Sequence, residues 1–418
     1  MFSGSLSNGV RYAAEPMQGF RSVSLGVWIN AGSVYERGGE NGLAHFIEHM
    51  LFKGTQNASA AEIAERMDAV GGNLNAFTAK ECTCFYGRVL QNSMQVLAGT
   101  LADMLTAPLL DPDDIVREQG VVIEEISMTE DSPEDLVTDS AFSLFYEGDP
   151  LERPILGTRE SVRSFTRDGL VSYLGRLYNA NNVVVSAAGC FTEEELLPVL
   201  EASFGRLPAG ESPAQAFGTH TLGKRLRVVR KDIEQVHICI NLPGYSKDQP
   251  QNWAQLLFSN AFGGAMSSRL FQSVRERSGL AYSVYSYPTA YEKSGFITLY
   301  AGTGPENAVR VTELVLSELD RVKRGGLTSE ELSRAKDQLV ASYLMAREST
   351  SARGSALGRT VLSGRRVLTE EETVEKIMAV TMDDIASILP TVCSTDDTSS
   401  CIVGRTDGAE AELRALLN

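Results

Sequence analysis

The pattern of apolar and polar positions divides the chain into two halves and predicts the same order of helices and strands in each. Each half predicts strands, a pair of helices, an aromatic hairpin, a long helix, and a final helix followed by a strand. The main helices are expected at 42–53, 59–70, 93–107 and 112–130 in the first half, and at 251–262, 266–277, 305–323, 329–347 and 379–388 in the second. Because strands and helices mix without strict alternation, we expect α+β domains in which helices pack on largely antiparallel sheets.

Comparison of the two long helices supports a duplication. The segment DPDDIVREQGVVIEEISM (111–128) aligns without gaps on TSEELSRAKDQLVASYLM (328–345), and both begin with a capping residue and an acidic first turn. Between the halves, FGRLPAGESPAQAFGTHTLGK (204–224) is rich in Gly, Pro, Ala and Ser, as is typical of a linker. We therefore expect an N-terminal domain at 1–206, a linker at 207–224 and a homologous C-terminal domain at 225–418.

Composition and charge narrow the class of function. A net charge of −16 argues against nucleic-acid binding, which needs clustered Lys and Arg. The excess of acid has two interpretations, which are solubility and an acidic cleft that attracts cationic peptides. No apolar stretch reaches the roughly 18 residues of a membrane span, and the first residues have no leader pattern. Six thinly spread cysteines fit reduced thiols, so we expect a cytoplasmic protein without a membrane segment.

The helix expected at 42–53 has recognisable ends and an almost wholly apolar surface. Asn41 can cap its start, and Gly54 can end it. Its apolar residues cover almost the whole circumference, so we expect burial on most faces.

Three polar residues interrupt this apolar helix within the segment AHFIEHMLF (44–52). At about 100° per residue, His45, Glu48 and His49 lie on one stripe. An ionised and unpaired glutamate there is costly, whereas a dication held by two imidazoles one turn apart supplies a partner. A hydrogen-bonded pair of core histidines is the alternative interpretation. The complete H-x-x-E-H pattern is the reversed form of the zincin motif and favours a metal site.

A catalytic zinc ion needs a third protein ligand and an open position for water, and two His with one Glu is a known ligand set. The other histidines are poor candidates, because His220 lies in the expected linker and His237 on an expected strand of the second half. The helix at 112–130 offers Glu118 and Glu125, which are seven residues apart and therefore share one face.

The duplicated helix provides an internal comparison. At the positions of Glu118 and Glu125 it carries Ala335 and Ser342, so the acidic pair belongs to the first half only. A solvated acidic face is the alternative interpretation, and it fits Glu124 well. Spacing favours Glu125 as the ligand through its pairing with Glu118, but it does not settle the choice against Glu124.

With these motifs in hand, the chain resembles the M16 family of zinc metallopeptidases, in particular mitochondrial processing peptidase and its bacterial relatives. The resemblance runs through nearly the whole length and includes GLAHFIEHMLFKGT, GGNLNAFTAKECTCFYGRV, REQGVVIEEISMTEDSPED and GGAMSSRLFQSVRERSGLAYSVYS. It implies that His45, His49 and Glu125 bind one Zn²⁺ per chain and that Glu48 is the general base. It also implies that Glu118 supports the site, and that the N-terminal domain is the catalytic one.

The resemblance further implies the residues that meet the substrate. A peptide strand would dock by β-augmentation on the edge strand NLNAFT, where Asn75 and Ala76 contact its backbone. Arg275 and Tyr282 of the second half would reach the active site and, with the metal, stabilise the oxyanion while Glu48 takes a proton from water. Without the resemblance, a surface charge is the simpler interpretation of Arg275, and a core aromatic that of Tyr282.

The family fold implies two homologous domains arranged as a clamshell around a chamber for extended or unfolded peptides. AFGGAMSSRL lies where the non-catalytic subunit of the mitochondrial enzyme has its glycine-rich loop, and here the stretch is short. Because the same chain holds the metal motif, we expect a homodimer, with a heterodimer containing an M16-like partner as the alternative. The expected function is a zinc-dependent endopeptidase acting on presequence-like segments or oligopeptides, cationic ones included. The alternative is a non-catalytic or partner-dependent subunit of an M16-type complex.

Overall fold

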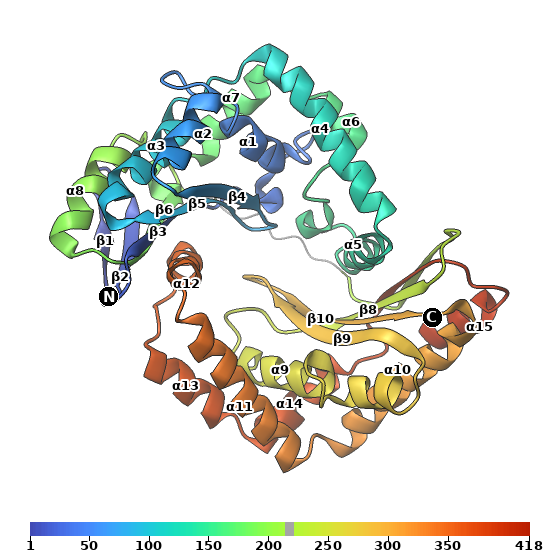
Figure 1. Cartoon of the computed structure of the whole chain (residues 1–418). Coiled ribbons are helices and arrows are strands. Elements are labelled where there is room, and N and C mark those ends of the chain that lie inside the picture. Colours follow the sequence, from blue (N-terminus) through green and yellow to red (C-terminus); the bar gives the residue numbers. More distant parts are fainter. Residues whose placement is uncertain (214–220) are drawn as a thin grey trace. The chain divides into compact units, whose positions relative to one another are not determined.

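The computed structural model describes residues 1–213 and 221–418, which form two compact units (Figure 1). Unit 1 comprises Met1–Ser127, residues 153–213 and Leu344–Val367, and unit 2 comprises Met128–Glu152, residues 221–343 and Leu368–Asn418. Each unit therefore takes one segment from the other half of the chain. Of the linker expected at 207–224, residues 214–220 lie outside the described residues.

Unit 1 is built on a six-stranded sheet in the order β1-β2-β6-β3-β5-β4. Its strands are β1 (Phe2–Ser5), β2 (Arg11–Pro16), β3 (Ser22–Ile29), β4 (Asn73–Thr78), β5 (Thr83–Leu90) and β6 (Val183–Gly189). β2 and β6 run parallel and the other neighbours run antiparallel, which confirms the largely antiparallel sheet. β4 lies at an edge of this sheet, so among the strands of the described residues only β5 pairs with it.

The helices of unit 1 pack an apolar core against this sheet. They are α1 (Leu43–Leu51), α2 (Ala60–Ala69), α3 (Met94–Thr106), α4 (Pro112–Asp131), α6 (Arg159–Arg163), α7 (Arg167–Leu177), α8 (Glu193–Phe204) and α12 (Thr350–Leu362). The first four confirm the predicted helices to within two residues at each end. Phe46, Ile47 and Met50 of α1 are fully buried in the same core as Val27 and Phe85 of the sheet, so α1 is held on most sides.

Unit 2 repeats this plan with five strands in the order β7-β11-β8-β10-β9. The strands are β7 (Arg225–Val229), β8 (Val236–Gly244), β9 (Ala281–Ala290), β10 (Gly295–Thr303) and β11 (Ser399–Val403). The helices are α5 (Pro133–Phe145), α9 (Asn252–Ser259), α10 (Ala308–Gly325), α11 (Ser329–Ala346), α13 (Glu370–Ala379), α14 (Met382–Val392) and α15 (Glu410–Leu417). β7 pairs with β11 in parallel, just as β2 pairs with β6, which supports the duplication.

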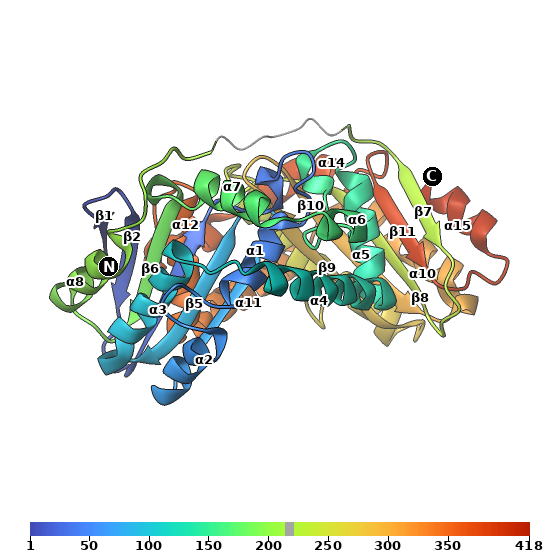
Figure 2. The same cartoon turned by 90° about the horizontal axis from the view of Figure 1, so that it is seen from above.

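Two helices at matching places in the repeat are exchanged between the halves. The alignment of 111–128 with 328–345, continued along the chain, matches α5 with α12 from the first residue to the last. Ser132 and Ser349 cap the two helices in the same way. α12 comes from the second half but packs on β2, β3 and β6 of unit 1, whereas α5 comes from the first half and packs on β7, β8 and β11 (Figures 1 and 2). The pattern of apolar residues in the sequence did not predict α12, because small residues form the face by which this helix packs. At Gly358, for example, a Cβ would clash with Trp28.

The structure differs from the helix predicted at 266–277. The second part of this segment is π-helical over Phe271–Glu276 (η6), and α9 also ends in a π-helical turn over Asn260–Gly264 (η5). Wide turns of this kind are rare and are frequently found at functional sites. The turn in η5 brings Gly263 against the backbone of Ser286 on β9, where a Cβ would not fit. Close packing of backbone on backbone therefore accompanies the wide turn.

None of the helices in the described part of the chain has the length and apolar content needed to cross a membrane.

Candidate metal centre

α1 carries the polar stripe, and its start is held by a carboxylate from outside the helix. The helix is capped at Gly42, whose φ of 89° glycine adopts without strain, so the cap expected at Asn41 is wrong. Glu36 Oε2 accepts the backbone N–H of Gly42 at 3.1 Å, and its Oε1 accepts that of Ala44 at 3.0 Å. This carboxylate replaces an N-cap side chain, because it satisfies two donors that a helix start leaves without partners.

Glu36 is itself a buried group, with 3% of its surface exposed. Burial raises the pKa of its carboxyl to about 8, against the lowering effect of the N–H groups of Ala44 and Gly42. The helix ends at Leu51, earlier than the predicted stop at Gly54, which follows with a φ of 125°. α1 is thus a short helix fixed at its start by one buried contact and along its length by the core.

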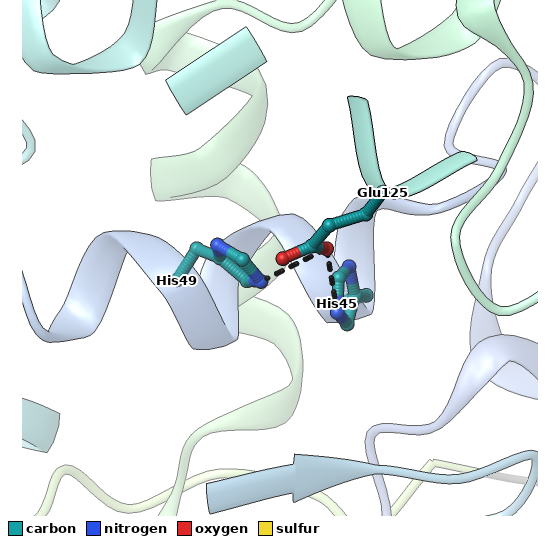
Figure 3. Close-up of side chains that lie close together, drawn as sticks. All are labelled: His45, His49 and Glu125. Carbon is teal, nitrogen blue, oxygen red and sulfur yellow. Dashed lines mark ion pairs between the residues drawn. The ribbon is translucent and has the colours of Figure 1, made fainter. Parts of the chain in front are cut away.

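The structure brings His45 and His49 of α1 together with Glu125 of α4 (Figure 3). Glu125 Oε2 lies 3.8 Å from Nε2 of His45 and 3.5 Å from Nε2 of His49, and the two imidazole centroids are 4.5 Å apart. Within the described residues, these three side chains make the one group of His, Cys, Asp or Glu that could hold a metal ion. Glu124 is exposed and lies outside the group, so the geometry favours Glu125 where spacing left the choice open.

Glu118 lies two turns before Glu125 on α4 and contacts the site from behind. Its Oε1 is 2.9 Å from Nδ1 of His49, and its Oε2 is 2.6 Å from Nζ of Lys53. Burial by itself raises the pKa of Glu118, but the bonds to His49 and Lys53 lower it overall. The Nδ1–H of His49 donates to an ionised Glu118, which leaves the Nε2 that faces Glu125 unprotonated in the neutral ring.

The two imidazoles titrate in opposite directions. Burial, together with the neighbouring His49, lowers the pKa of His45 to about 4. Burial also acts to lower the pKa of His49, but its bond to Glu118 and the charges of Glu125, Glu118 and Glu48 raise it overall. At neutral pH His45 is therefore neutral, which is the form that binds a metal ion.

Glu48 lies on the same stripe and is held by the edge strand. The hydroxyl of Thr78, the last residue of β4, donates to Glu48 Oε2 at 2.6 Å. Burial raises the pKa of Glu48, while the bond from Thr78 and the neighbouring His49 lower it and Glu125 raises it. A carboxylate whose pKa is raised toward neutrality is a better general base than an ordinary glutamate.

The substrate-binding residues expected on NLNAFT lie on β4 at the edge of the sheet, as predicted. Asn75 is exposed, while Ala76 is half-buried and packs against the core. Thr78 shares the face of Ala76, because alternate residues of a strand point the same way. The outer backbone edge of β4 therefore lies on the same strand as Thr78, the residue that bonds Glu48.

In unit 2, Arg275 and Tyr282 form a stacked pair. The guanidinium carbon of Arg275 lies 5.0 Å from the ring centroid of Tyr282 and 4.8 Å from that of Phe271. The register of β9 on β10 shifts between Gly302 and Thr303, which leaves Tyr282 as the extra residue of a bulge. Because 75% of its surface is exposed, the interpretation of Tyr282 as a core aromatic is wrong. Their role in catalysis stays a prediction.

His237 behaves as a structural residue. It lies on β8, as expected, and its Nδ1 is 2.8 Å from the hydroxyl of Tyr300. His220 lies outside the described residues.

Three contacts at the site were not found by sequence reasoning, and one of them left a signal. Thr78 occupies the same face of the strand as Ala76, so a period of two counted from Ala76 would have pointed to it. Lys53 and Glu36 gave no periodic signal, since each meets the site through a contact between separate segments.

Two family models match consecutive parts of the chain. The one described as "Insulinase (Peptidase family M16)" matches residues 12–159. The one described as "Peptidase M16 inactive domain" matches residues 164–339. The metal centre lies within the first match and the Arg275–Tyr282 pair within the second.

Relatives match over most of the chain. "Uncharacterized zinc protease YmxG" of Bacillus subtilis is 40% identical over 384 residues, which cover 90% of this chain and 92% of the relative. "Uncharacterized zinc protease SCO5738" of Streptomyces coelicolor is 37% identical over 391 residues, covering 92% and 85%. A solved structure of a protease from Helicobacter pylori has a TM-score of 0.91 at 20% identity, covers 97% of this chain and 99% of that chain, and shows the same fold. The chain therefore belongs to the M16 family of peptidases.

Proposed function

We propose that the chain is a zinc-dependent endopeptidase that hydrolyses extended or unfolded peptides. The observation that carries the proposal is the convergence of His45, His49 and Glu125, with Glu48 on the same stripe of α1. Relatives named as zinc proteases over most of the chain support the same reaction class.

The three side chains fit a zinc ion by donor type and by spacing. Two imidazoles and one carboxylate are a known catalytic set, which leaves a fourth position open. In a tetrahedral site with bonds of about 2.1 Å, ligand atoms lie about 3.4 Å apart. The distances from Glu125 Oε2 to His49 Nε2 and His45 Nε2, 3.5 and 3.8 Å, are close to that value.

The residues around the site have separate tasks in peptide hydrolysis. When bound, zinc polarises the scissile carbonyl and acidifies water. Glu48 takes the proton of the attacking water and passes it to the leaving amine, a role for which its raised pKa is suited. Glu118 holds the Nδ1 proton of His49 and so keeps that ring in its ligating tautomer.

The edge strand supports an extended substrate. A peptide that adds to β4 would gain main-chain hydrogen bonds beside Asn75 and Ala76, and this mode tolerates many side chains. The proposed substrates are therefore unfolded segments or oligopeptides rather than folded domains. A part for Arg275 and Tyr282 in stabilising the oxyanion belongs to this proposal as well.

Charge supports a preference for cationic peptides. Between residues 111 and 140 the chain carries eleven carboxylates and one basic residue, Arg117. This segment contains the ligand Glu125 and accounts for most of the net charge of −16. A local excess of negative charge raises the concentration of cationic peptides nearby and speeds their association, more so at low salt.

The proposal is tested with the purified full chain, an extended-peptide library and metal analysis of the same sample. We expect about one zinc per chain, cleavage that a chelator abolishes and added zinc restores, and faster cleavage of cationic than of acidic peptides. Zinc without cleavage would favour the alternative, a non-catalytic or partner-dependent subunit. A chain that takes up no zinc would contradict the ligand assignment. The molecular mass in solution, measured alongside, tests the proposed homodimer.

A further inference from the structure

Thr78 connects two parts of the site that sequence reasoning treated separately. It is the last residue of β4, the strand to which a substrate is proposed to add, and its hydroxyl donates to Glu48 Oε2 at 2.6 Å. Thr78 and Glu48 are both half-buried, so this bond is partly shielded from water. A short bond to a carboxylate in such surroundings is of the stronger, charge-assisted kind.

The direction of this bond follows from its acceptor, because an ionised carboxylate accepts hydrogen bonds and donates none. Thr83, paired with Thr78 across β4 and β5, is fully buried and donates its hydroxyl proton to the carbonyl of Ala31 at 3.1 Å. The two threonine oxygens are 3.5 Å apart, and Thr83 has no second proton to give. The proton of Thr78 goes to Glu48 at 2.6 Å rather than to Thr83 at 3.5 Å, because the carboxylate is the nearer and the charged acceptor.

The bond decides how Glu48 presents its two oxygens. Glutamate reaches through three rotatable bonds, and without a partner its carboxylate samples several orientations. The hydroxyl of Thr78 engages one lone pair of Oε2, which leaves Oε1 the freer oxygen to take a proton. General-base catalysis needs that oxygen at hydrogen-bond distance from the attacking water, and small displacements are costly.

We propose that Thr78 is a positioning residue for the general base Glu48, an inference that rests on the proposed function. The substrate backbone and the base are then aligned by one strand, since β4 offers its edge to the peptide and its last hydroxyl to Glu48. Thr78 touches neither the metal ligands nor the peptide edge through this hydroxyl. Its loss therefore impairs turnover more than substrate binding or zinc binding.

The inference is tested by Thr78→Val, which keeps the shape and removes the hydroxyl, and by Thr78→Ser, which keeps the hydroxyl. We expect Thr78→Val to lower kcat about 10- to 100-fold, with KM and zinc content within about twofold of wild type. Thr78→Ser is expected to retain most of kcat. Thr289→Val is the matched control, because Thr289 is a half-buried threonine near the end of β9, the edge strand of unit 2. It should behave as wild type.

Several outcomes would overturn the inference. One is Thr78→Val with an unchanged kcat, and another is a loss shared equally by kcat, KM and zinc content, which would indicate a structural role. If Thr78→Val does not fold, Thr78→Ala and Thr78→Ser carry the comparison, and equal kcat values in these two would overturn it. A wild-type chain that cleaves no peptide would instead overturn the proposed function, and this inference with it.

Discussion

The two long helices, α4 and α11, share one design and differ in their chemistry. Both start with a capping side chain, since Asp111 Oδ1 accepts the N–H of Asp113 at 2.8 Å and Thr328 Oγ1 accepts that of Glu331 at 3.2 Å. Where α4 carries Glu118, α11 carries Ala335, which is 1% exposed. The copies therefore kept the same backbone frame, and buried charge is present in only one of them.

The helices are also tied down by different means. In unit 1, Lys53 and His49 meet Glu118, and both histidines of α1 meet Glu125. In unit 2, Arg269 makes two bonds of 2.7 Å to Glu331 of α11, and no comparable metal-binding group occurs in the described part of that unit. An ordinary ion pair is thus enough to hold such a helix, so the acids of α4 are not required by the fold. Their presence is better explained by function.

The largest expected effect comes from giving α4 the residue of α11. Glu125→Ser removes the carboxylate ligand and should lower peptide cleavage by at least about 1,000-fold, with most of the zinc lost. Metal analysis and kcat/KM check this outcome. Ser342→Ala, at the matching and exposed position of α11, is the control and should change neither quantity. Full zinc content in Glu125→Ser would break the comparison.

The reverse exchange tests whether unit 2 tolerates buried charge. Ala335→Glu places a carboxylate in a buried position, and the described residues of unit 2 show no contacts corresponding to those of His49 and Lys53 with Glu118. We expect it to lower the free energy of unfolding by about 3 kcal/mol, as an uncompensated buried charge does. Urea denaturation measures the change. Ser342→Glu, at an exposed position, should stay within about 0.5 kcal/mol of wild type. Equal stabilities of the two variants would show that the copies do not differ as described.

A smaller effect is expected from Glu118→Ala, which again copies α11. His49 loses the acceptor that sets its tautomer, so zinc affinity should fall about 10- to 100-fold while one zinc still binds at saturation. Competition with a chromophoric chelator measures the affinity. Glu124→Ala is the control, because Glu124 is exposed and outside the metal group. An unchanged affinity in Glu118→Ala would remove Glu118 from the account.

The smallest effect concerns the ion pair that holds α11. Burial by itself raises the pKa of Glu331, but Arg269 and the N–H of Thr328 lower it below its usual value of 4.5. The unfolded chain therefore binds more protons near pH 4.5, and the stabilising effect is present above that pH and lost as pH falls below it. Glu331→Gln should be about 1 kcal/mol less stable than wild type at pH 7. This difference in the free energy of unfolding should become smaller as the pH falls below about 4.5. Unchanged zinc content is expected, and a gap independent of pH would contradict the assignment.

The sequence predicted those parts of the molecule that repeat with a period. The apolar period located α1 and α4, the H-x-x-E-H pattern located the histidine pair, and the aligned copies marked Glu118 and Glu125 as special to one half. It did not predict α5 or α12, and for α12 the reason is that small residues on its contact face leave no periodic pattern of large apolar side chains.

Contacts between separate segments were the other failure of prediction. Asn41 has a suitable side chain for a cap, yet Glu36 provides the contact, because the loop folds that carboxylate over the first N–H groups of α1. Thr78 reaches Glu48 only once β4 lies beside α1. Such contacts depend on the tertiary fold, which the pattern of a single sequence does not reveal.

The central claim is that the polar stripe of α1 is a catalytic metal site, and Glu48→Gln tests it most directly. The substitution keeps the shape and size of the side chain and removes its capacity as a base. Cleavage of an extended peptide and zinc content are measured on the same samples of wild type and variant. The account predicts equal zinc in both and a kcat at least about 100-fold lower in the variant. A variant that cleaves as fast as wild type would contradict it.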